Sequence, residues 1–118
     1  MTQNISAIYY NNQLLCSKVK VVRGFWKKLR GLRFYRDFPD EADGLLLYGC
    51  KFVSMLGMRF AVDLIYLSQN QQVLYTVEGL VPNKFGPFIA DAYYILELKT
   101  GVIAAYHIKA GDFMIIKN

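Results

Sequence analysis

The alternation of apolar and polar residues along the chain predicts a fold built mainly from short β-strands. Some apolar runs alternate with polar positions, which is typical of strands with one solvated face, and others are apolar on both faces. Two asparagines, Asn11 and Asn12, and the polar stretch 68–71 are suited to tight hairpin turns. The predicted strands are 5–10, 14–22, 45–48, 62–67, 73–77, 93–98 and 113–116.

Helical spacing occurs in two places. Trp26 and Leu29 recur at helical intervals among basic residues, which predicts a short helix within 24–34. Thr100 is placed to cap a second helix over 101–107. The fold class is therefore mainly β, a small open or closed β-barrel-like domain with one or two short helices. A chain of 118 residues fits a single domain, 1–118.

Positive charge is concentrated in one segment. Residues 18–36 hold eight basic residues and no acidic one, while the rest of the chain sums to −3. Aromatic residues such as Trp26 and Phe34 are interleaved, so the segment could bind nucleic acid or an acidic partner. The alternative, which the helical spacing favours, is a solvated basic face with its aromatics in the core. The basic residues are Lys18, Lys20, Arg23, Lys27, Lys28, Arg30, Arg33 and Arg36.

Several classes of protein are disfavoured by the sequence. No apolar run approaches the ~20 residues that span a bilayer, and the first fifteen residues lack a secretory pattern, so we expect a cytoplasmic protein without a membrane partner. Cys16 and Cys50 are expected to be buried free thiols. His107 is the sole histidine, so no metal site is expected, and no motif indicates a cofactor.

Three acidic residues lie where burial is expected. Asp63 and Glu97 sit within apolar strands and Asp112 follows a turn. Buried carboxylates need partners, and Arg59, Arg33 and Arg36 are the candidates. In the functional interpretation, Arg59, Asp63, Glu97 and Asp112 line a polar pocket for a ligand. In the structural interpretation, which we favour, the acids form salt bridges and backbone caps.

Four segments in order resemble the family called domain of unknown function 192. They are 29–34 (LRGLRF), 43–48 (DGLLLY), 54–66, which contains GMRF and VDLIY, and 94–101, which contains LELKTG and is followed by 110–112 (AGD). The resemblance covers about residues 24–117. It implies a compact β-barrel-like fold and no particular reaction. The sequence departs from the family pattern at Leu56 and Gly57, where members often have an aromatic residue and tryptophan.

The leading functional hypothesis is a non-enzymatic binding or accessory module. It would hold a small ligand or peptide near Arg59, Asp63 and Glu97, or at the long loop 80–91. One alternative is a nucleic-acid or acidic-partner binder that uses 18–36. Another is a hydrolase-like enzyme that uses the buried acids. A monomer or weak homodimer is expected.

Overall fold

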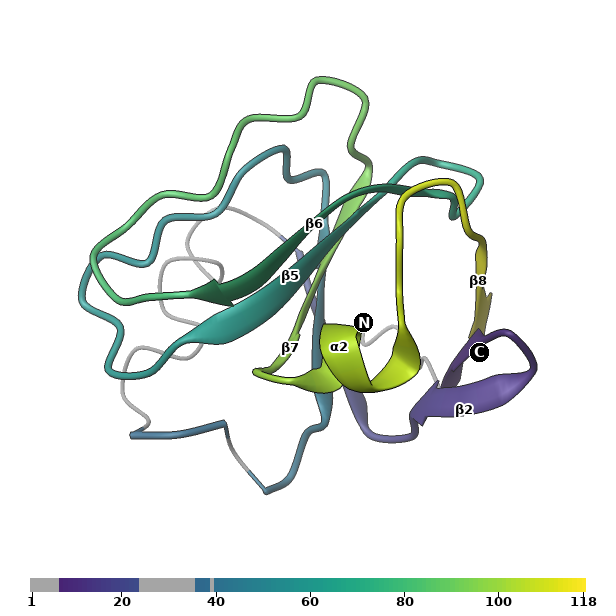
Figure 1. The fold of residues 1–118 in the computed structure, drawn as a ribbon, viewed down its shortest axis with the longest axis horizontal. Helices are drawn as coiled ribbons and strands as arrows, with labels where there is room; N and C mark the ends of the chain where they lie inside the picture. Colours follow the sequence, from purple (N-terminus) through teal and green to yellow (C-terminus); the bar gives the residue numbers. More distant parts are fainter. Residues whose placement is uncertain (1–6, 24–35, 39) are drawn as a thin grey trace.

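The computed structural model describes residues 7–23, 36–38 and 40–118 (Figure 1). The prediction of a mainly β domain is confirmed, but the strands described here form two open sheets, and neither closes into a barrel. The predicted helix within 24–34 lies outside the described residues. The elements are β1 (Ala7–Tyr10), β2 (Gln13–Cys16), β3 (Val19–Val22), β4 (Gly44–Tyr48), β5 (Val62–Leu67), β6 (Val73–Leu80), β7 (Tyr94–Lys99), α2 (Val102–Tyr106) and β8 (Met114–Lys117).

The smaller sheet has the order β2-β1-β8 and is antiparallel. The predicted hairpin joins β1 to β2. Its two turn residues have positive φ, 50° at Asn11 and 62° at Asn12, which is the backbone conformation that twisted two-residue hairpins require. Strand β8 then returns from the far end of the chain to pair with the other edge of β1.

The larger sheet has the order β3-β4-β7-β5-β6, in which β3 and β4 are parallel and the other neighbours antiparallel. The predicted hairpin over 68–71 joins β5 to β6. Strand β5 is buried along its whole length, and so are the four central residues of β7. These two strands therefore lie between layers, as their apolar faces predict.

The prediction of one continuous strand over 14–22 is wrong. The segment forms β2 and β3, which belong to different sheets. At the break, the Asp43 carboxylate accepts hydrogen bonds of 2.9 Å from the backbone nitrogens of Ser17 and Lys18. The Asp43 nitrogen in turn donates to the Lys18 carbonyl oxygen. A side chain 25 residues away in sequence thus holds the bend between the two sheets.

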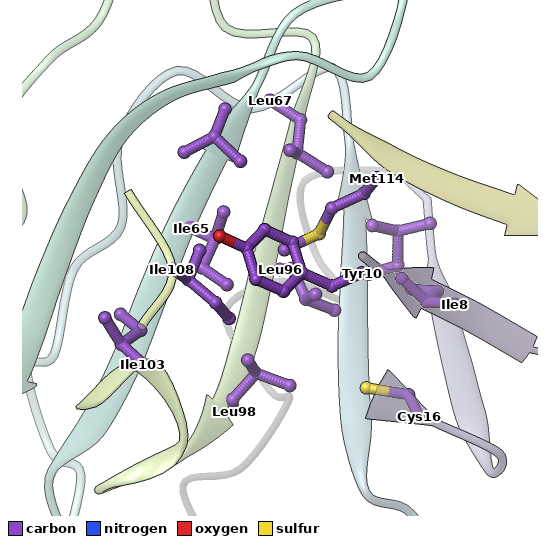
Figure 2. Packing of buried hydrophobic residues seen from close by; sticks show 12 residues of the cluster. Ile8, Tyr10, Cys16, Ile65, Leu67, Leu96, Leu98, Ile103, Ile108 and Met114 are labelled. Atoms are coloured by element: carbon purple, nitrogen blue, oxygen red, sulfur yellow. The ribbon is translucent and has the colours of Figure 1, made fainter. Parts of the chain in front are cut away.

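Each face of the larger sheet packs against a separate apolar cluster. The first face packs against the smaller sheet and α2, and Figure 2 shows the Tyr10 ring at the centre of that cluster, beside Ile108 and Met114. The second face is covered largely by the loops 49–61 and 81–93. Figure 1 shows these two loops running side by side beyond the ends of β5 and β6. Buried loop residues on the second face are Cys50, Val53, Met55, Met58 and Ala92.

Helix α2 confirms the prediction of a helix over 101–107, but not its cap. Gly101, with φ of 97°, occupies the N-cap position, and no side-chain hydrogen bond from the cap residue is formed. Thr100 is therefore not the cap. None of the helices in the described part of the chain is long and apolar enough to span a membrane.

Candidate functional site

Asp63 is bound by backbone amides. Its side chain is 1% exposed. The Oδ1 atom accepts a hydrogen bond of 2.8 Å from the nitrogen of Gly79, and Oδ2 accepts bonds of 3.1 and 3.0 Å from Gly101 and Ile103. Of the predicted arginine partners, Arg59 and Arg36 are exposed, and Arg33 lies outside the described residues. The geometry agrees with the structural interpretation of this carboxylate.

Asp112 also has a partner inside the fold. Its Oδ2 atom accepts a hydrogen bond from the Tyr10 hydroxyl, which lies 3.1 Å from the His107 carbonyl oxygen. Burial, and then the hydrogen bond and charge of Asp112, raise the pKa of Tyr10 to about 12. This contact joins β1 to the turn before β8.

Asp63 and Glu97 lie on opposite faces of the larger sheet. In the register between β5 and β7, Asp63 is opposite Leu98, whereas Glu97 is opposite Leu64. Directly paired residues point to the same side and successive residues to opposite sides. Asp63 therefore shares the first face with Leu98, and Glu97 shares the second with Leu64. A reaction that needs both carboxylates on one substrate does not fit this arrangement.

Glu97 lies in an apolar environment on the second face. It is 6% exposed and is flanked across the sheet by Leu45 and Leu64. Burial raises the pKa of its carboxyl to about 7. The pKa of Tyr66 is raised to about 12, mainly by burial and to a smaller degree by the charges of Tyr75, Cys50 and Glu97.

The two loops that cover the second face are joined by backbone hydrogen bonds. The Met55 nitrogen donates to Lys84 and the Gly86 nitrogen donates to Val53, each at 2.8 Å. The nitrogen of Asn83 donates to Met55 at 2.9 Å. These bonds form a short antiparallel ladder centred on the bridge between residues 54 and 85. Loop 80–91 was predicted as a functional candidate, but its pairing with 49–61 was not.

Side-chain hydrogen bonds also join the same loops to the sheet and to each other. The Tyr66 hydroxyl of β5 donates to the Pro87 carbonyl oxygen at 2.8 Å. The Lys51 ammonium donates to the carbonyl oxygens of Ala90 and Ala92 at 2.7 and 3.0 Å. The Asn83 Oδ1 atom accepts from the Gly57 nitrogen at 3.0 Å. The loops are therefore held at several points on both sides of the ladder.

The outer side of the joined loops carries large apolar side chains in contact with solvent. The rings of Phe52 and Phe88, from different loops, lie 6.4 Å apart. Three cations, Lys51, Arg59 and Lys84, are exposed on the same loops. We call the exposed apolar group the loop-pair surface. It consists of Phe52 (47% exposed), Leu56 (59%), Val81 (48%), Phe85 (66%) and Phe88 (65%).

The basic segment is described only at its two ends. Lys18, Lys20 and Arg23 are exposed, and so is Arg36. The guanidinium carbon of Arg23 lies 3.8 Å from the centre of the Tyr48 ring. The other predicted basic residues, Lys27, Lys28, Arg30 and Arg33, lie outside the described residues, as do Trp26 and Phe34.

Comparison with known proteins supports the family and the fold. The family model DUF192, described as "Uncharacterized ACR", matches residues 8–116. A protein of unknown function from Novosphingobium aromaticivorans is 21% identical, with a TM-score of 0.72 over 82% of this chain and 73% of that one. A proposed transcription regulator from Sinorhizobium meliloti is 19% identical, with a TM-score of 0.69 over 83% and 80%. No curated protein matches the sequence. At these identities the structural likeness concerns the fold alone.

Proposed function

We propose that this chain, which belongs to the DUF192 family, is a non-enzymatic binding module that holds a protein or peptide segment on the loop-pair surface. The observation that carries the proposal is the exposure of five large apolar side chains on two joined loops, led by Phe85 and Phe88 at 66% and 65%. Exposed apolar side chains that gather in one place mark interaction sites more often than single ones do.

The backbone of the proposed surface is ordered before a partner arrives. The ladder between the loops and the contact from Tyr66 to Pro87 fix the positions from which the apolar side chains project. A partner then loses less conformational entropy on binding than it would with mobile loops. Aromatic side chains also offer a large contact area with few rotatable bonds, which suits Phe52, Phe85 and Phe88 to the centre of an interface.

Charge favours an acidic partner. Arg59 and Lys84 are exposed on the two loops, whereas Asp91 is the one acidic residue in 49–61 and 81–93. Cations at the rim of an apolar surface attract carboxylates and speed their encounter. The partner that fits is therefore a segment with aromatic or aliphatic side chains flanked by aspartate or glutamate.

Of the four residues of the polar-pocket hypothesis, only Arg59 remains in this proposal, because it is exposed on loop 49–61. Asp63 and Asp112 are engaged by partners within the fold, and Glu97 is enclosed on the second face. A hydrolase-like function has less support for the same reason, since its two buried acids lie on opposite faces.

A random peptide library displayed on phage tests the proposal. We expect the full chain to enrich peptides that combine acidic residues with aromatic or aliphatic anchors. Binding of an enriched peptide should be lost in Phe85→Asp and retained in Ile115→Asp, a matched control with a 49% exposed apolar side chain on β8. Failure to enrich such peptides, or equal loss in both variants, would contradict the proposal.

A second candidate function is the binding of nucleic acid through the basic segment. The observation that favours it is the exposure of Lys18, Lys20 and Arg23 along β3, the outermost described strand on that side of the larger sheet. The structural neighbour from Sinorhizobium meliloti carries a regulatory description. Binding to generic nucleic acid should then weaken steeply as salt increases. An affinity insensitive to salt would exclude this candidate.

We also propose that the protein works in a reducing compartment such as the cytoplasm. Cys16 and Cys50 are both buried, and neither forms a disulfide. Oxidising compartments favour disulfides in small domains, so two reduced cysteines fit a reducing compartment better.

A further inference from the structure

An aromatic and cationic row crosses the end of the larger sheet from which the loops 49–61 and 81–93 depart. Tyr48 of β4 is paired with Tyr94 of β7, and Tyr94 is paired with Leu67 of β5. The parallel register that pairs Val22 with Leu47 places Arg23 beside Tyr48. The row lies on the first face, where Leu67 belongs to the apolar cluster and Tyr48 and Tyr94 pack against it.

Three tyrosine rings meet at this end of the sheet. The ring centres of Tyr48 and Tyr94 are 4.9 Å apart, those of Tyr93 and Tyr94 are 4.7 Å apart, and those of Tyr48 and Tyr93 are 6.3 Å apart. Each pair is packed edge to face, with interplanar angles of 67° to 80°. The guanidinium of Arg23 covers the Tyr48 face at 3.8 Å. We call these four residues the tyrosine–arginine cluster.

The cluster is held firmly but is open to solvent at Tyr93. The Tyr93 nitrogen donates to Leu67 at 2.8 Å, and its carbonyl oxygen accepts from Gly49 at 2.9 Å. Its side chain nevertheless remains 39% exposed. Tyr94 is half-buried, and burial is the main cause of its raised pKa. Because the backbone at Tyr93 is already fixed, a ligand ring can stack on the exposed Tyr93 ring without first ordering this part of the chain.

We propose that the tyrosine–arginine cluster binds a planar ring that carries a phosphate group, the chemistry of a nucleotide, either free or within a single strand. The ligand ring stacks against Tyr93, as bases stack on exposed aromatic side chains in single-strand binding proteins. The positive charge of the Arg23 guanidinium attracts the phosphate.

Tyr93 is the last residue of loop 81–93, but none of the four residues is among the five that define the loop-pair surface. The two proposals are therefore tested by different variants. Nucleotide binding would also explain why three tyrosines and an arginine lie together at the edge of the apolar cluster. Edge-to-face pairs of this kind stabilise a sheet, but a purely structural cluster predicts no affinity for nucleotides. The two roles are therefore distinguishable by binding.

The test measures the binding of adenosine monophosphate, adenosine and a twelve-nucleotide single strand to the full chain by titration calorimetry. Tyr93→Ala should weaken binding by about fivefold or more, the effect of losing one stacked base, while Tyr93→Phe keeps the ring and should bind nearly as the unchanged protein does. Tyr75→Ala is the matched control, because Tyr75 is 46% exposed on β6. Arg23→Gln should weaken the phosphate-bearing ligands and leave adenosine unaffected.

The three ligands also separate the two sources of the nucleotide. Similar affinity for the monophosphate and the strand supports a free nucleotide, and tight binding of the strand alone supports single-stranded nucleic acid. The proposal is overturned if no ligand binds, or if Tyr93→Ala and Tyr75→Ala have the same effect. Circular dichroism of each variant verifies that the fold is retained, so a loss of binding reports on the cluster itself.

Discussion

The carboxylate of Asp63 on β5 caps the first turn of α2 by accepting a hydrogen bond of 3.0 Å from the Ile103 nitrogen. The same oxygen accepts a hydrogen bond from the Gly101 nitrogen. Asp63 therefore binds two backbone amides at the start of α2, where the N-cap residue is a glycine and has no side chain that could bind them. The other oxygen binds the Gly79 nitrogen on β6. One buried residue therefore connects helix α2 and the edge strand β6 to β5, which lies between β7 and β6 in the larger sheet.

Replacing Asp63 with alanine should lower the free energy of unfolding by roughly 2 to 4 kcal/mol, because three backbone amides then lose their acceptor within the fold. Thermal and denaturant unfolding measure this change. Glu78→Ala is the control, since Glu78 is an exposed acid on the neighbouring strand, and it should have little effect. A melting temperature unchanged by Asp63→Ala would contradict the structural role.

Local signals explain why much of the fold could be predicted. The hairpin at Asn11 and Asn12 and the turn at 68–71 are determined by residues close in sequence, and both occur where expected. The break between β2 and β3 could not be predicted in this way, because apolar alternation continues through 14–22. It depends on Asp43, which reaches back to Ser17 and Lys18 across the sheet boundary.

The candidate sites could also be predicted only as far as local sequence determines them. Burial of Asp63 and Glu97 follows from their apolar neighbours, but the faces to which they point depend on the pairing of β5 with β7. Loop 80–91 was recognised by its prolines and length, whereas 49–61 has no such signal. Its alternation of exposed Phe52 with buried Val53 and Met55 indicates a strand-like edge only when the partner loop is known.

Both thiols should resist modification in the folded protein. Cys16 is fully buried, and burial, followed by the charge of Asp43, raises its pKa to about 12. Cys50 is buried on the second face. Iodoacetamide should therefore label both residues only after unfolding, with or without a reducing agent. Mass spectrometry measures the labelling; a mass lower by two hydrogens, with neither thiol labelled, would reveal a disulfide instead.

Gly86 should tolerate no side chain while Tyr66 is present. A Cβ atom at position 86 would lie 2.6 Å from the Tyr66 hydroxyl oxygen and 3.1 Å from the Leu64 side chain. The Tyr66 ring is fully buried and cannot easily move aside. Gly86→Ala should therefore cost about 1 to 3 kcal/mol through overpacking and displace the loop that carries Phe85.

A double-mutant cycle identifies the cause of that cost. Tyr66→Phe alone removes the hydrogen bond to Pro87 and should be mildly destabilising. Combined with Gly86→Ala, it removes the atom that clashes, so the double variant should be more stable than the two single effects added together. Denaturant unfolding measures the free energy of each variant. If the effects of Tyr66→Phe and Gly86→Ala simply add, the contact between the new Cβ atom and the Tyr66 hydroxyl is not the cause of the destabilisation.

Glu97 should make the stability of the protein depend on pH in an unusual direction. Its pKa is raised by burial from 4.5 to about 7 in the folded protein. Between these values the folded state binds the proton more tightly than the unfolded chain does. The contribution of Glu97 to stability is therefore complete below pH 4.5 and is lost as the pH rises towards 7. Carboxylates with lowered pKa values act in the opposite sense, so this contribution must be isolated by comparison with a variant.

Glu97→Gln provides that comparison, because the amide has nearly the same shape and does not titrate. The difference in free energy of unfolding between the unchanged protein and Glu97→Gln should shift by roughly 3 kcal/mol in favour of the variant between pH 4.5 and pH 8. Denaturant unfolding at several pH values measures it. Glu78→Gln, at an exposed position on β6, is the matched control for replacing a carboxyl group by an amide. A constant difference for Glu97→Gln would mean that this carboxyl titrates alike in the folded and unfolded chain, contrary to its enclosure between Leu45 and Leu64.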